Sequence, residues 1–330
     1  MKEILNQLFE HQKLSKKQSR EVLIKISQEK YNPAQVAAFI SVYLMRSISV
    51  DELEGFRSAL LDLCVKVNID GEDCIDLCGT GGDGKNTFNV STLASFVVAG
   101  AGYRVTKHGN YGVSSVCGSS NVLQFLGYNF SNESDTLNKQ LDKANICFLH
   151  APLFHPALKS VGPIRRELGV KTFFNMLGPL VNPVQPKQQL VGVFDLKLAR
   201  LYQYLHEKLD KSFSIVHALD GYDEVSLTSE AKVINKKGES VLAPEDFGFN
   251  TLQAHQIYGG DTIESAADIF LKVIQNDCSP AQRNIVLANA ALAIQCYEPD
   301  TSLKSCVEKA RQSLLSGAAF SSFKQLVANS

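Results

Sequence analysis

The fold is decided by residues 72–92, which read EDCIDLCGTGGDGKNTFNVST. A short apolar strand ends at Gly79, a glycine-rich loop follows, and a helix begins at about Ser91. The next strand, YRVTKHG at residues 103–109, ends in a second glycine-rich loop that opens a further helix. This alternation of strand, loop and helix predicts an α/β fold with a mainly parallel central sheet flanked by helices on both faces.

Strand-like segments recur later in the chain and are mostly separated by helical stretches. They read ANICFLHA, QQLVGVF, SFSIVHAL, EVSLTS and AKVINKKG, and the last quarter is helical again without an internal repeat. Ligands of such a sheet bind outside the carboxyl ends of its strands. Both glycine-rich loops follow strand ends, so we expect them to form one site.

The first seventy residues show helical spacing only. Ser15 is placed to cap a helix over KKQSREVLIKIS, and Asn32 followed by Pro33 is a good start for AQVAAFISVYLM. We therefore expect a small all-helical N-terminal domain over residues 1–70 and a large α/β domain over residues 71–330.

Composition restricts the class of protein. The chain has 330 residues, of which 45% are hydrophobic, so it can form one large core or two smaller ones. Its formal net charge of -1 gives no overall basic field for a nucleic-acid backbone. The N-terminal MKEILNQLFEHQK lacks the apolar core of a signal peptide, and no stretch approaches the roughly 18 apolar residues of a membrane span. We expect no nucleic-acid partner and no membrane segment.

The eight cysteines include no C-x-x-C pair, and most lie in apolar runs such as NICFL. Buried thiols are therefore favoured over disulfides or a zinc site. This use of cysteine predicts a cytoplasmic protein.

The first loop matches two nucleotide-binding patterns only in part. A Walker A loop needs Ser or Thr directly after its lysine, but Asn86 follows Lys85, and the helix does not start there. A dinucleotide fold needs an acidic residue at the end of the next strand, where this chain has Lys107 and His108. Both interpretations are disfavoured.

A third interpretation uses the whole stretch. Glycines let main-chain N–H groups approach an anion, while Asn89, Ser91 and Thr92 add donors at a helix start, where amides and the dipole favour phosphate. Donors at both places suit a ligand with two separate phosphate groups. A tight glycine turn followed by an ordinary Ser/Thr cap remains the alternative.

Four segments in this order resemble the anthranilate phosphoribosyltransferase family of tryptophan biosynthesis, and the resemblance runs from the N-terminal helices to the C-terminus. The segments are GTGGDGKNTFNVST (79–92), KHGNYGVSSVCGSSNVLQFLG (107–127), FLHAPLFHPALKSVGPIRRELGVKTFFNMLGPLVNP (148–183) and DGYDEVSLT (220–228).

The resemblance implies an activity. The family transfers the phosphoribosyl group from 5-phosphoribosyl 1-diphosphate (PRPP) to the amine of anthranilate and releases pyrophosphate, the second step from chorismate to tryptophan. It implies Mg²⁺ as cofactor, with two ions per monomer. It also implies a homodimer formed through the helical domain, with which a few helices near residues 165–185 would pack.

The resemblance also implies site residues. For PRPP they are Gly79, Gly82, Asp83, Thr87, Asn89, Val90, Ser91, Thr92, Lys107, His108, Gly109, Asn110, Tyr111, Gly112, Val113, Ser114, Ser115 and Ser119. Gly79, Asn110 and Arg165 are implied for anthranilate, and Ser91, Asp223 and Glu224 for the metal. No residue is implied as a general acid or base.

The chain departs from the common family pattern in its second loop. Many members carry Arg where this chain has Tyr111, and the common KSGSAD is replaced by VCGSSN, with Val116, Cys117 and Asn121. A phosphate contact from the side chains at 111 or 117 is therefore in doubt. Contacts from main-chain amides, Lys107, Ser115 and Ser119 are unaffected.

The residue types fit this chemistry, although each has a simpler explanation. Hard cations such as Mg²⁺ prefer oxygen ligands, yet an Asp–Glu pair such as 223–224 is most often a solvated turn. Arg165 has the planar fork that binds a carboxylate in two places, but it and Arg166 could form surface ion pairs. His108 and His155 either line the aromatic ring's pocket or are structural.

Two other functions are possible for a chain with this pattern, and the sequence disfavours both. A pyrimidine nucleoside phosphorylase of the same fold needs no acidic metal pair, so Asp223 and Glu224 argue against it. A non-catalytic nucleic-acid-binding relative needs a basic groove, which 33 Lys and Arg against 34 Asp and Glu do not support.

Overall fold

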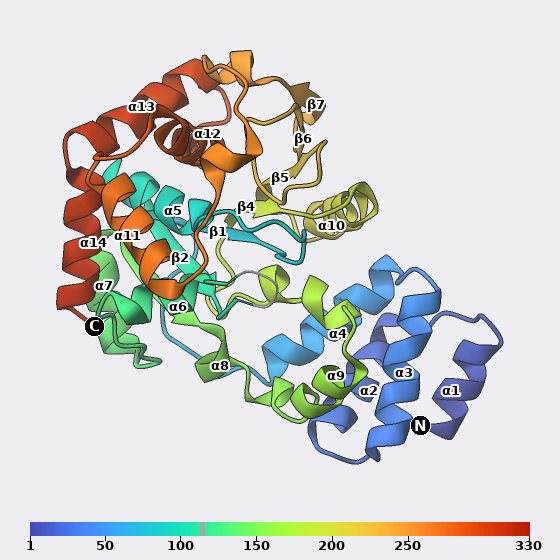
Figure 1. Ribbon diagram of the computed structural model, residues 1–330. Coiled ribbons are helices and arrows are strands. Elements are labelled where there is room, and N and C mark those ends of the chain that lie inside the picture. The colour runs from blue at the N-terminus through green and yellow to red at the C-terminus, as the bar shows by residue number, and fades with distance from the viewer. Residues whose placement is uncertain (113–115) are drawn as a thin grey trace. The chain divides into compact units, whose positions relative to one another are not determined.

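The computed structural model describes residues 1–112 and 116–330, which form two compact units. The helical unit comprises residues 1–66 and 151–183, and the α/β unit comprises residues 67–150 and 184–330. Figure 1 shows both, and each is treated below by itself.

The helical unit contains four N-terminal helices and a later group of short ones. They are α1 (Lys2–Phe9), α2 (Lys16–Ser27), α3 (Pro33–Met45), α4 (Val50–Asp62), α8 (Ala151–Phe154), α9 (Gly162–Leu168) and the 3-10 helices Pro156–Leu158, Phe173–Met176 and Gly178–Leu180. Ser15 and Asn32 cap α2 and α3 through capping boxes, which confirms both predicted helix starts. The rings of Phe39, Phe56 and Phe173 pack together in its core.

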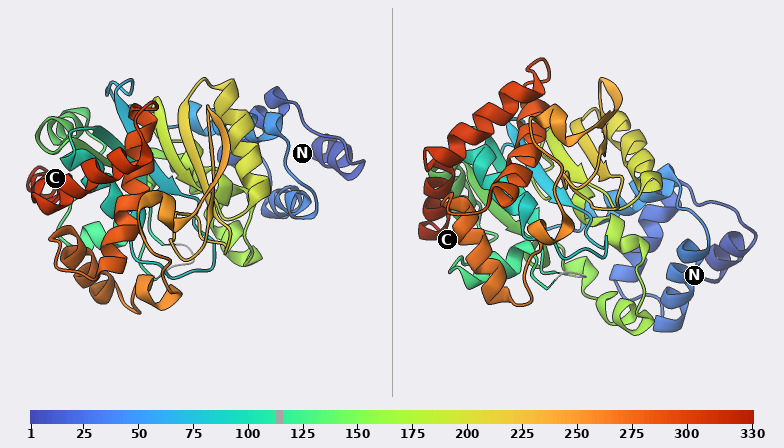
Figure 2. Two further views of the ribbon diagram at one scale, coloured as in Figure 1. Left: turned by 90° about the horizontal axis from the view of Figure 1, so that it is seen from above. Right: turned by 45° about the horizontal axis from the view of Figure 1, so that its top comes forward.

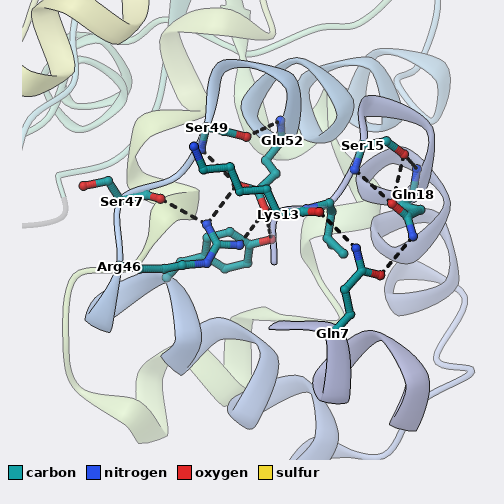
Figure 3. Close-up of polar contacts among 10 residues, drawn as sticks. Gln7, Lys13, Ser15, Gln18, Arg46, Ser47, Ser49 and Glu52 are labelled. Carbon is teal, nitrogen blue, oxygen red and sulfur yellow. Dashed lines mark hydrogen bonds and ion pairs between the residues drawn. The ribbon is translucent and has the colours of Figure 1, made fainter. Parts of the chain in front are cut away.

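A buried carboxylate ties this unit together (Figure 3). Glu52 is fully buried and accepts hydrogen bonds from the Leu14 amide (3.0 Å), the Ser49 amide (2.9 Å) and the Tyr43 hydroxyl (3.3 Å). The two terminal nitrogens of Arg46 donate to its oxygens at 3.0 and 2.5 Å. Five donors from the loop before α2, the end of α3 and the start of α4 therefore converge on one side chain.

The α/β unit is built on one seven-stranded sheet with the order β3-β2-β1-β4-β5-β6-β7. The strands are β1 (Cys74–Gly79), β2 (Arg104–Gly109), β3 (Ile146–His150), β4 (Gln188–Gly192), β5 (Ser212–Ala218), β6 (Ala231–Asn235) and β7 (Gly238–Leu242). Strands β3 to β5 along this order are parallel, while β6 and β7 pair antiparallel at the edge.

Helices cover both faces of this sheet (Figures 1 and 2). They are α5 (Val90–Gly100), α6 (Ser119–Phe125), α7 (Ser134–Ala144), α10 (Leu196–Lys208), α11 (Ile263–Ile274), α12 (Pro280–Tyr297), α13 (Leu303–Leu315) and α14 (Ala318–Ala328), with 3-10 helices at Pro244–Phe247 and Ala254–Ile257. The chain runs from β1 outward to β2 and β3, but from β4 in the opposite direction to β5. Right-handed crossovers then place α5 and α7 on one face and α10 on the other.

This architecture confirms the predicted fold class of a small helical part and a larger, mainly parallel α/β part. All eight cysteines are free thiols, and six of them are buried, as predicted. Among the described residues, no helix has both the length and the hydropathy to span a bilayer.

One strand prediction is wrong. Residues 224–229, EVSLTS, form bends and turns instead of a strand. Leu227 has a φ of +60°, and the side chains of Thr228 and Ser229 donate hydrogen bonds to the Asp220 carboxylate. These side-chain bonds offer the backbone an alternative to a sheet ladder. The segment therefore does not join the sheet.

Candidate active site

The strand order reverses between β1 and β4, and their carboxyl ends lie side by side, with Gly79 paired to Gly192. A parallel sheet opens a crevice at such a reversal, and ligands bind there. The loop that leaves β1, residues 79–89, is called the glycine loop below. The first glycine loop predicted from the sequence thus lies at the place in the fold best suited to a ligand.

An acidic turn, residues 220–224, lies directly against these two strand ends. A Cβ atom added at Gly79 would overlap the Asp223 carboxylate, and one added at Gly192 would overlap the Asp223 carbonyl oxygen. Both positions must therefore be glycine for the turn to pack where it does. The Gly81 amide donates to the Asp223 carboxylate at 2.7 Å and links the glycine loop to the acidic turn.

The glycine loop uses left-handed backbone at Gly81, Gly82 and Gly84, with φ of +62°, +76° and +75°. Helix α5 begins only at Val90, five residues after Lys85, so the geometry of a Walker A loop is absent, as predicted. The side chain of Asn89 does not cap α5, which removes the alternative of an ordinary side-chain cap at this position. The first amides of α5 are oriented as in helix starts that bind phosphate.

Ser91, Asp223 and Glu224 line one small cavity of about 10 Å³. This is the size of one water molecule or one ion. The rest of its lining is Cys78, Gly192, Asn289 and the apolar side chains of Leu190 and Val216. The three side chains that the sequence proposed for metal binding come from α5 and the acidic turn. The fold brings all three to the same space.

The carboxylates beside this cavity carry more negative charge than the protein balances. Burial, and then the charge of Asp83, raise the pKa of Asp223 to about 7. Burial and the charges of Asp223 and Asp83 raise the pKa of Glu224 well above its ordinary value. A cation placed here would reverse both shifts, because it favours the ionised forms.

Other buried polar atoms of the glycine loop lack a protein partner. The Thr80 hydroxyl and the Asn89 amide oxygen are buried without a hydrogen bond. Such atoms usually mark an ion, a water or a ligand. Within residues 1–112 and 116–330, no group of three or more His, Cys, Asp or Glu side chains could hold a metal ion unaided. The site fits Mg²⁺, which commonly takes one or two carboxylates and completes its shell with substrate phosphates and water.

Lys107, in the second half of β2, lies next to Ser91. Its side chain is only 2% exposed, and its ammonium donates to the Leu77 carbonyl at 2.6 Å and to the Ser91 hydroxyl at 3.5 Å. Burial lowers its pKa. The lysine thus supplies a positive charge behind Ser91.

The second loop, residues 107–119, is in contact with the glycine loop. The Asn89 side-chain amide donates to the Cys117 carbonyl at 3.0 Å. Asn121, one of the departures from the family pattern, accepts from the amides of Gly112 (2.9 Å) and Gly118 (3.0 Å) and joins the two ends of the loop. The two glycine-rich loops therefore converge. The proposed PRPP contacts at Val113, Ser114 and Ser115 lie outside the described residues.

At two positions that differ from the family pattern, Tyr111 and Cys117, the side chain contacts other parts of the protein. The Tyr111 hydroxyl donates to Gln124 at 3.1 Å, and its ring meets the His150 ring edge-on at 5.0 Å. Cys117 is buried, and burial raises the pKa of its thiol to about 11. Neither group is a cation, so a phosphate near them would rely on Ser119 and the main chain.

The remaining proposed PRPP residues of the α/β unit lie along the same two loops. Asp83 accepts a hydrogen bond from the Lys85 amide at 3.0 Å, while Thr87 pairs with Tyr258 in an isolated bridge. Thr92 is buried in the first turn of α5. Val90 begins α5. At the end of β2, His108 is buried with its amide donating to the Asp76 carboxylate, and Gly109 packs against Phe148 and Ser119. Asn110, the next residue, is exposed.

Arg165 belongs to α9 of the helical unit and is half-buried, whereas Arg166 is exposed. The Arg165 guanidinium donates to the Asn175 side chain at 3.3 Å and lies 5.4 Å from the centre of the Phe174 ring. Among the described residues no carboxylate pairs with Arg165, so a surface ion pair does not explain it. His155 of this unit bonds the Val181 carbonyl through Nε2 at 2.8 Å, as a structural histidine does.

Two residues that support the site were missed in the sequence. One is Gly192, whose lack of a side chain admits the acidic turn. The other is Asn289 of α12, which is buried and bonds both the amide (3.1 Å) and the carbonyl (2.9 Å) of Val225, next to Glu224. An asparagine inside the apolar run IVLANAALAI was the available signal.

Comparison with known proteins agrees with this geometry. Residues 71–320 match the family described as "Glycosyl transferase family, a/b domain", and residues 2–64 match its helical bundle domain. An anthranilate phosphoribosyltransferase of Cytophaga hutchinsonii is 56% identical over 327 residues, which cover 99% of this chain and 100% of that protein. The chain belongs to the anthranilate phosphoribosyltransferase family.

Solved structures of this family are also similar. The anthranilate phosphoribosyltransferase of Saccharomyces cerevisiae in complex with PRPP and Mg matches with a TM-score of 0.91 and 26% identity, covering 98% of this chain and 96% of that one. The same yeast enzyme in complex with 4-fluoroanthranilate matches with a TM-score of 0.88, 25% identity and the same coverage.

Proposed function

We propose that this protein transfers the phosphoribosyl group of PRPP to the amine of anthranilate, giving N-(5-phosphoribosyl)anthranilate and pyrophosphate. One observation carries the assignment of the site. Ser91, Asp223 and Glu224 line a single ion-sized cavity beside a glycine loop at the reversal point of the sheet. Membership of the anthranilate phosphoribosyltransferase family supports the choice of substrates.

The diphosphate end of PRPP would bind at the glycine loop and at the start of α5. The donors there are main-chain amides, including that of Gly82, and the side chains of Asn89, Ser91 and Thr92. The uncapped first turn of α5 adds its dipole to these contacts. The 5-phosphate end would bind at the second loop, where Ser119 lies, while the Lys107 ammonium faces Ser91 at the diphosphate end. The contact between Asn89 and Cys117 holds the two loops at a fixed separation.

Ser91, Asp223 and Glu224 would hold Mg²⁺, with two ions per monomer. The metal would supply charge neutralisation of the diphosphate. The raised pKa values of Asp223 and Glu224 support this role, because ionising both carboxylates is unfavourable without a cation.

For the acceptor, we propose that Arg165 binds the anthranilate carboxylate and that Asn110 orients the amine, near Gly79. Arg165 has no competing carboxylate among the described residues, and Asn175 and Phe174 hold its planar group in place. Burial lowers the pKa of Arg165, which leaves its positive charge poorly hydrated and favours an anionic ligand.

The chemical step needs little covalent help from the protein. The bond from C1 of the ribose to the diphosphate oxygen breaks, its electron pair leaves with pyrophosphate, and the amine nitrogen bonds to C1. An aromatic amine is nearly neutral at pH 7 and attacks without a strong base. Fixed donors around the leaving group and a correctly placed amine supply the rate.

We further propose a cytoplasmic homodimer formed through the helical unit. Phe9 of α1 and Leu44 and Met45 of α3 are 59%, 46% and 91% exposed, and apolar side chains this exposed commonly mark an interface. Eight free thiols fit a reducing compartment.

The assay is the loss of anthranilate fluorescence with PRPP and Mg²⁺, paired with calorimetry of PRPP binding with and without Mg²⁺. We expect turnover that requires both, and tighter PRPP binding when Mg²⁺ is present. Correctly folded protein that neither consumes anthranilate nor binds PRPP with Mg²⁺ would refute the proposal.

A further inference from the structure

Lys85 made the glycine loop look like a Walker A motif, and the function above gives it no role. It follows Gly84, whose φ of +75° turns the chain, and its amide donates to the Asp83 carboxylate at 3.0 Å. Its ammonium lies 4.6 Å from the centre of the Tyr222 ring. Lys85 therefore links the glycine loop to the acidic turn through a cation–π contact.

The surroundings of this ammonium are unusual for a lysine. The two segments that it joins carry Asp83, Asp220, Asp223 and Glu224. None of the described carboxylates forms an ion pair with the Lys85 ammonium, which stays on the aromatic face instead. The residue is half-buried, so its position is set by the loops rather than by bulk water. Within the described part of the chain, a lysine ammonium without a carboxylate partner thus lies against Tyr222, the residue before Asp223.

We propose that the Lys85 ammonium binds the diphosphate group of the donor and stabilises its charge as it leaves. The inference rests on the proposed function, because it takes the leaving group to be pyrophosphate held at the glycine loop. Tyr222 directly precedes Asp223, which lines the ion-sized cavity, and its ring holds the ammonium on the acidic turn, where the diphosphate would bind.

Physical chemistry favours this exchange of partners. A lysine ammonium is a point charge on a flexible stem, and a phosphate oxygen is a stronger partner for it than the face of a tyrosine ring. As the bond from C1 to oxygen breaks, negative charge grows on the diphosphate. A nearby fixed cation stabilises that charge without transferring a proton.

The test compares two ligands that share parts of the donor. Isothermal titration with Mg²⁺ present measures binding of pyrophosphate and of ribose 5-phosphate to the whole protein and its variants. For Lys85→Met we expect pyrophosphate affinity to fall about tenfold or more and ribose 5-phosphate affinity to stay within about twofold. Lys85→Arg, which keeps the charge, restores most of the pyrophosphate affinity. Lys272→Met on the exposed face of α11 controls for the loss of one positive charge.

Other outcomes overturn the proposal. Unchanged pyrophosphate affinity in Lys85→Met would show that the ammonium does not touch the leaving group. An equal loss of affinity for both ligands, or a marked fall in Tm, would show that Lys85 only stabilises the structure of the two loops. These results differ from a failure of the proposed function, in which the wild-type protein itself would neither bind pyrophosphate nor consume anthranilate.

Discussion

Two regions of this molecule hold carboxylates that are fully or partly buried, and the two regions compensate their charge in opposite ways. In the helical unit, Glu52 accepts hydrogen bonds from two amides, a tyrosine and both terminal nitrogens of Arg46 (Figure 3). In the α/β unit, Glu224 borders an ion-sized cavity beside Asp223. Glu52 has five donors from the protein, whereas Glu224 lies among like charges that raise its pKa.

The acidities of the two side chains record this difference. Burial alone would raise the pKa of Glu52, but hydrogen bonds from Arg46 and from the Leu14 and Ser49 amides outweigh it, so its pKa is lowered. At Glu224 burial and neighbouring negative charges act together and raise the pKa. A fully buried acid with its own donors is therefore structural, whereas a half-buried acid among other acids marks a binding site.

The largest effect is expected when the two acidic side chains of Asp223 and Glu224 are both neutralised. Asp223→Asn combined with Glu224→Gln should reduce turnover at least about 10³-fold, because the metal supplies several kcal/mol of charge stabilisation. The Tm of the metal-free protein should stay or rise, because two poorly compensated charges are removed. Turnover as a function of Mg²⁺ and thermal unfolding measure the two effects. A normal Mg²⁺ titration would place the metal elsewhere.

The same kind of change in the satisfied region should have the opposite result. Glu52→Gln should lower the free energy of unfolding by about 3 kcal/mol, because it leaves the mostly buried Arg46 without its counter-charge. Activity per folded molecule should not change. Asp62→Asn breaks an exposed pair with Arg20 and should cost less than about 1 kcal/mol. Urea unfolding measures both losses of unfolding free energy. Equal losses for the two variants would show that the buried Glu52 stabilises the fold no more than an exposed ion pair does.

A third test extends the comparison from acids to arginines. Arg46 has its carboxylate in the protein, and Arg165 has none among the described residues. Arg165→Ala should therefore raise the KM for anthranilate about thirtyfold, or about 2 kcal/mol, while the KM for PRPP stays within about twofold. The exposed neighbour variant Arg166→Ala is the matched control. An unchanged KM for anthranilate would exclude Arg165 from acceptor binding.

A smaller effect should follow from the support of the acidic turn. Asn289→Leu removes the side chain that bonds both the amide and the carbonyl of Val225. We expect the Mg²⁺ concentration for half-maximal turnover to rise about tenfold, as for residues that orient metal ligands. If only stability changed and the Mg²⁺ dependence did not, Asn289 would support the fold alone.

The smallest effect is a pH dependence of stability. The pKa of Glu52 is lowered in the folded protein, so its stabilisation is full above its ordinary value of 4.5 and is lost as pH falls through the lower folded pKa. The gap in unfolding free energy between the wild type and Glu52→Gln should therefore narrow in acid. Urea unfolding at neutral pH and near about pH 3 tests this, and a constant gap would contradict it.

Local signals in the sequence carried most of the fold. Ser15 and Asn32 cap their helices through residues three positions away, so pattern alone located both starts. The segment 224–229 has strand-like composition but is bent, because Asn289, more than sixty residues later, and the Asp220 carboxylate bind it. A distant partner of this kind leaves no mark on local periodicity.

The candidate site divides in the same way. The glycine loop stands in a compact motif, so its residues could be proposed from the sequence, whereas Asp223 and Glu224 were proposed as metal ligands only through the family resemblance. Gly192 could not, because an isolated glycine at the end of QQLVG looks like any strand end. Its role depends on the acidic turn that the fold lays against it. Such a contact exists only in three dimensions.

The paired glycines 79 and 192 also bear on how this protein can change over generations. They sit opposite each other on neighbouring strands, and both abut the same aspartate. A methyl group at either position would push that aspartate outward, and no change at the other could make room again. Neither glycine can therefore be replaced, although neither carries a reactive atom. Related sequences should keep both glycines as strictly as they keep Asp223 and Glu224.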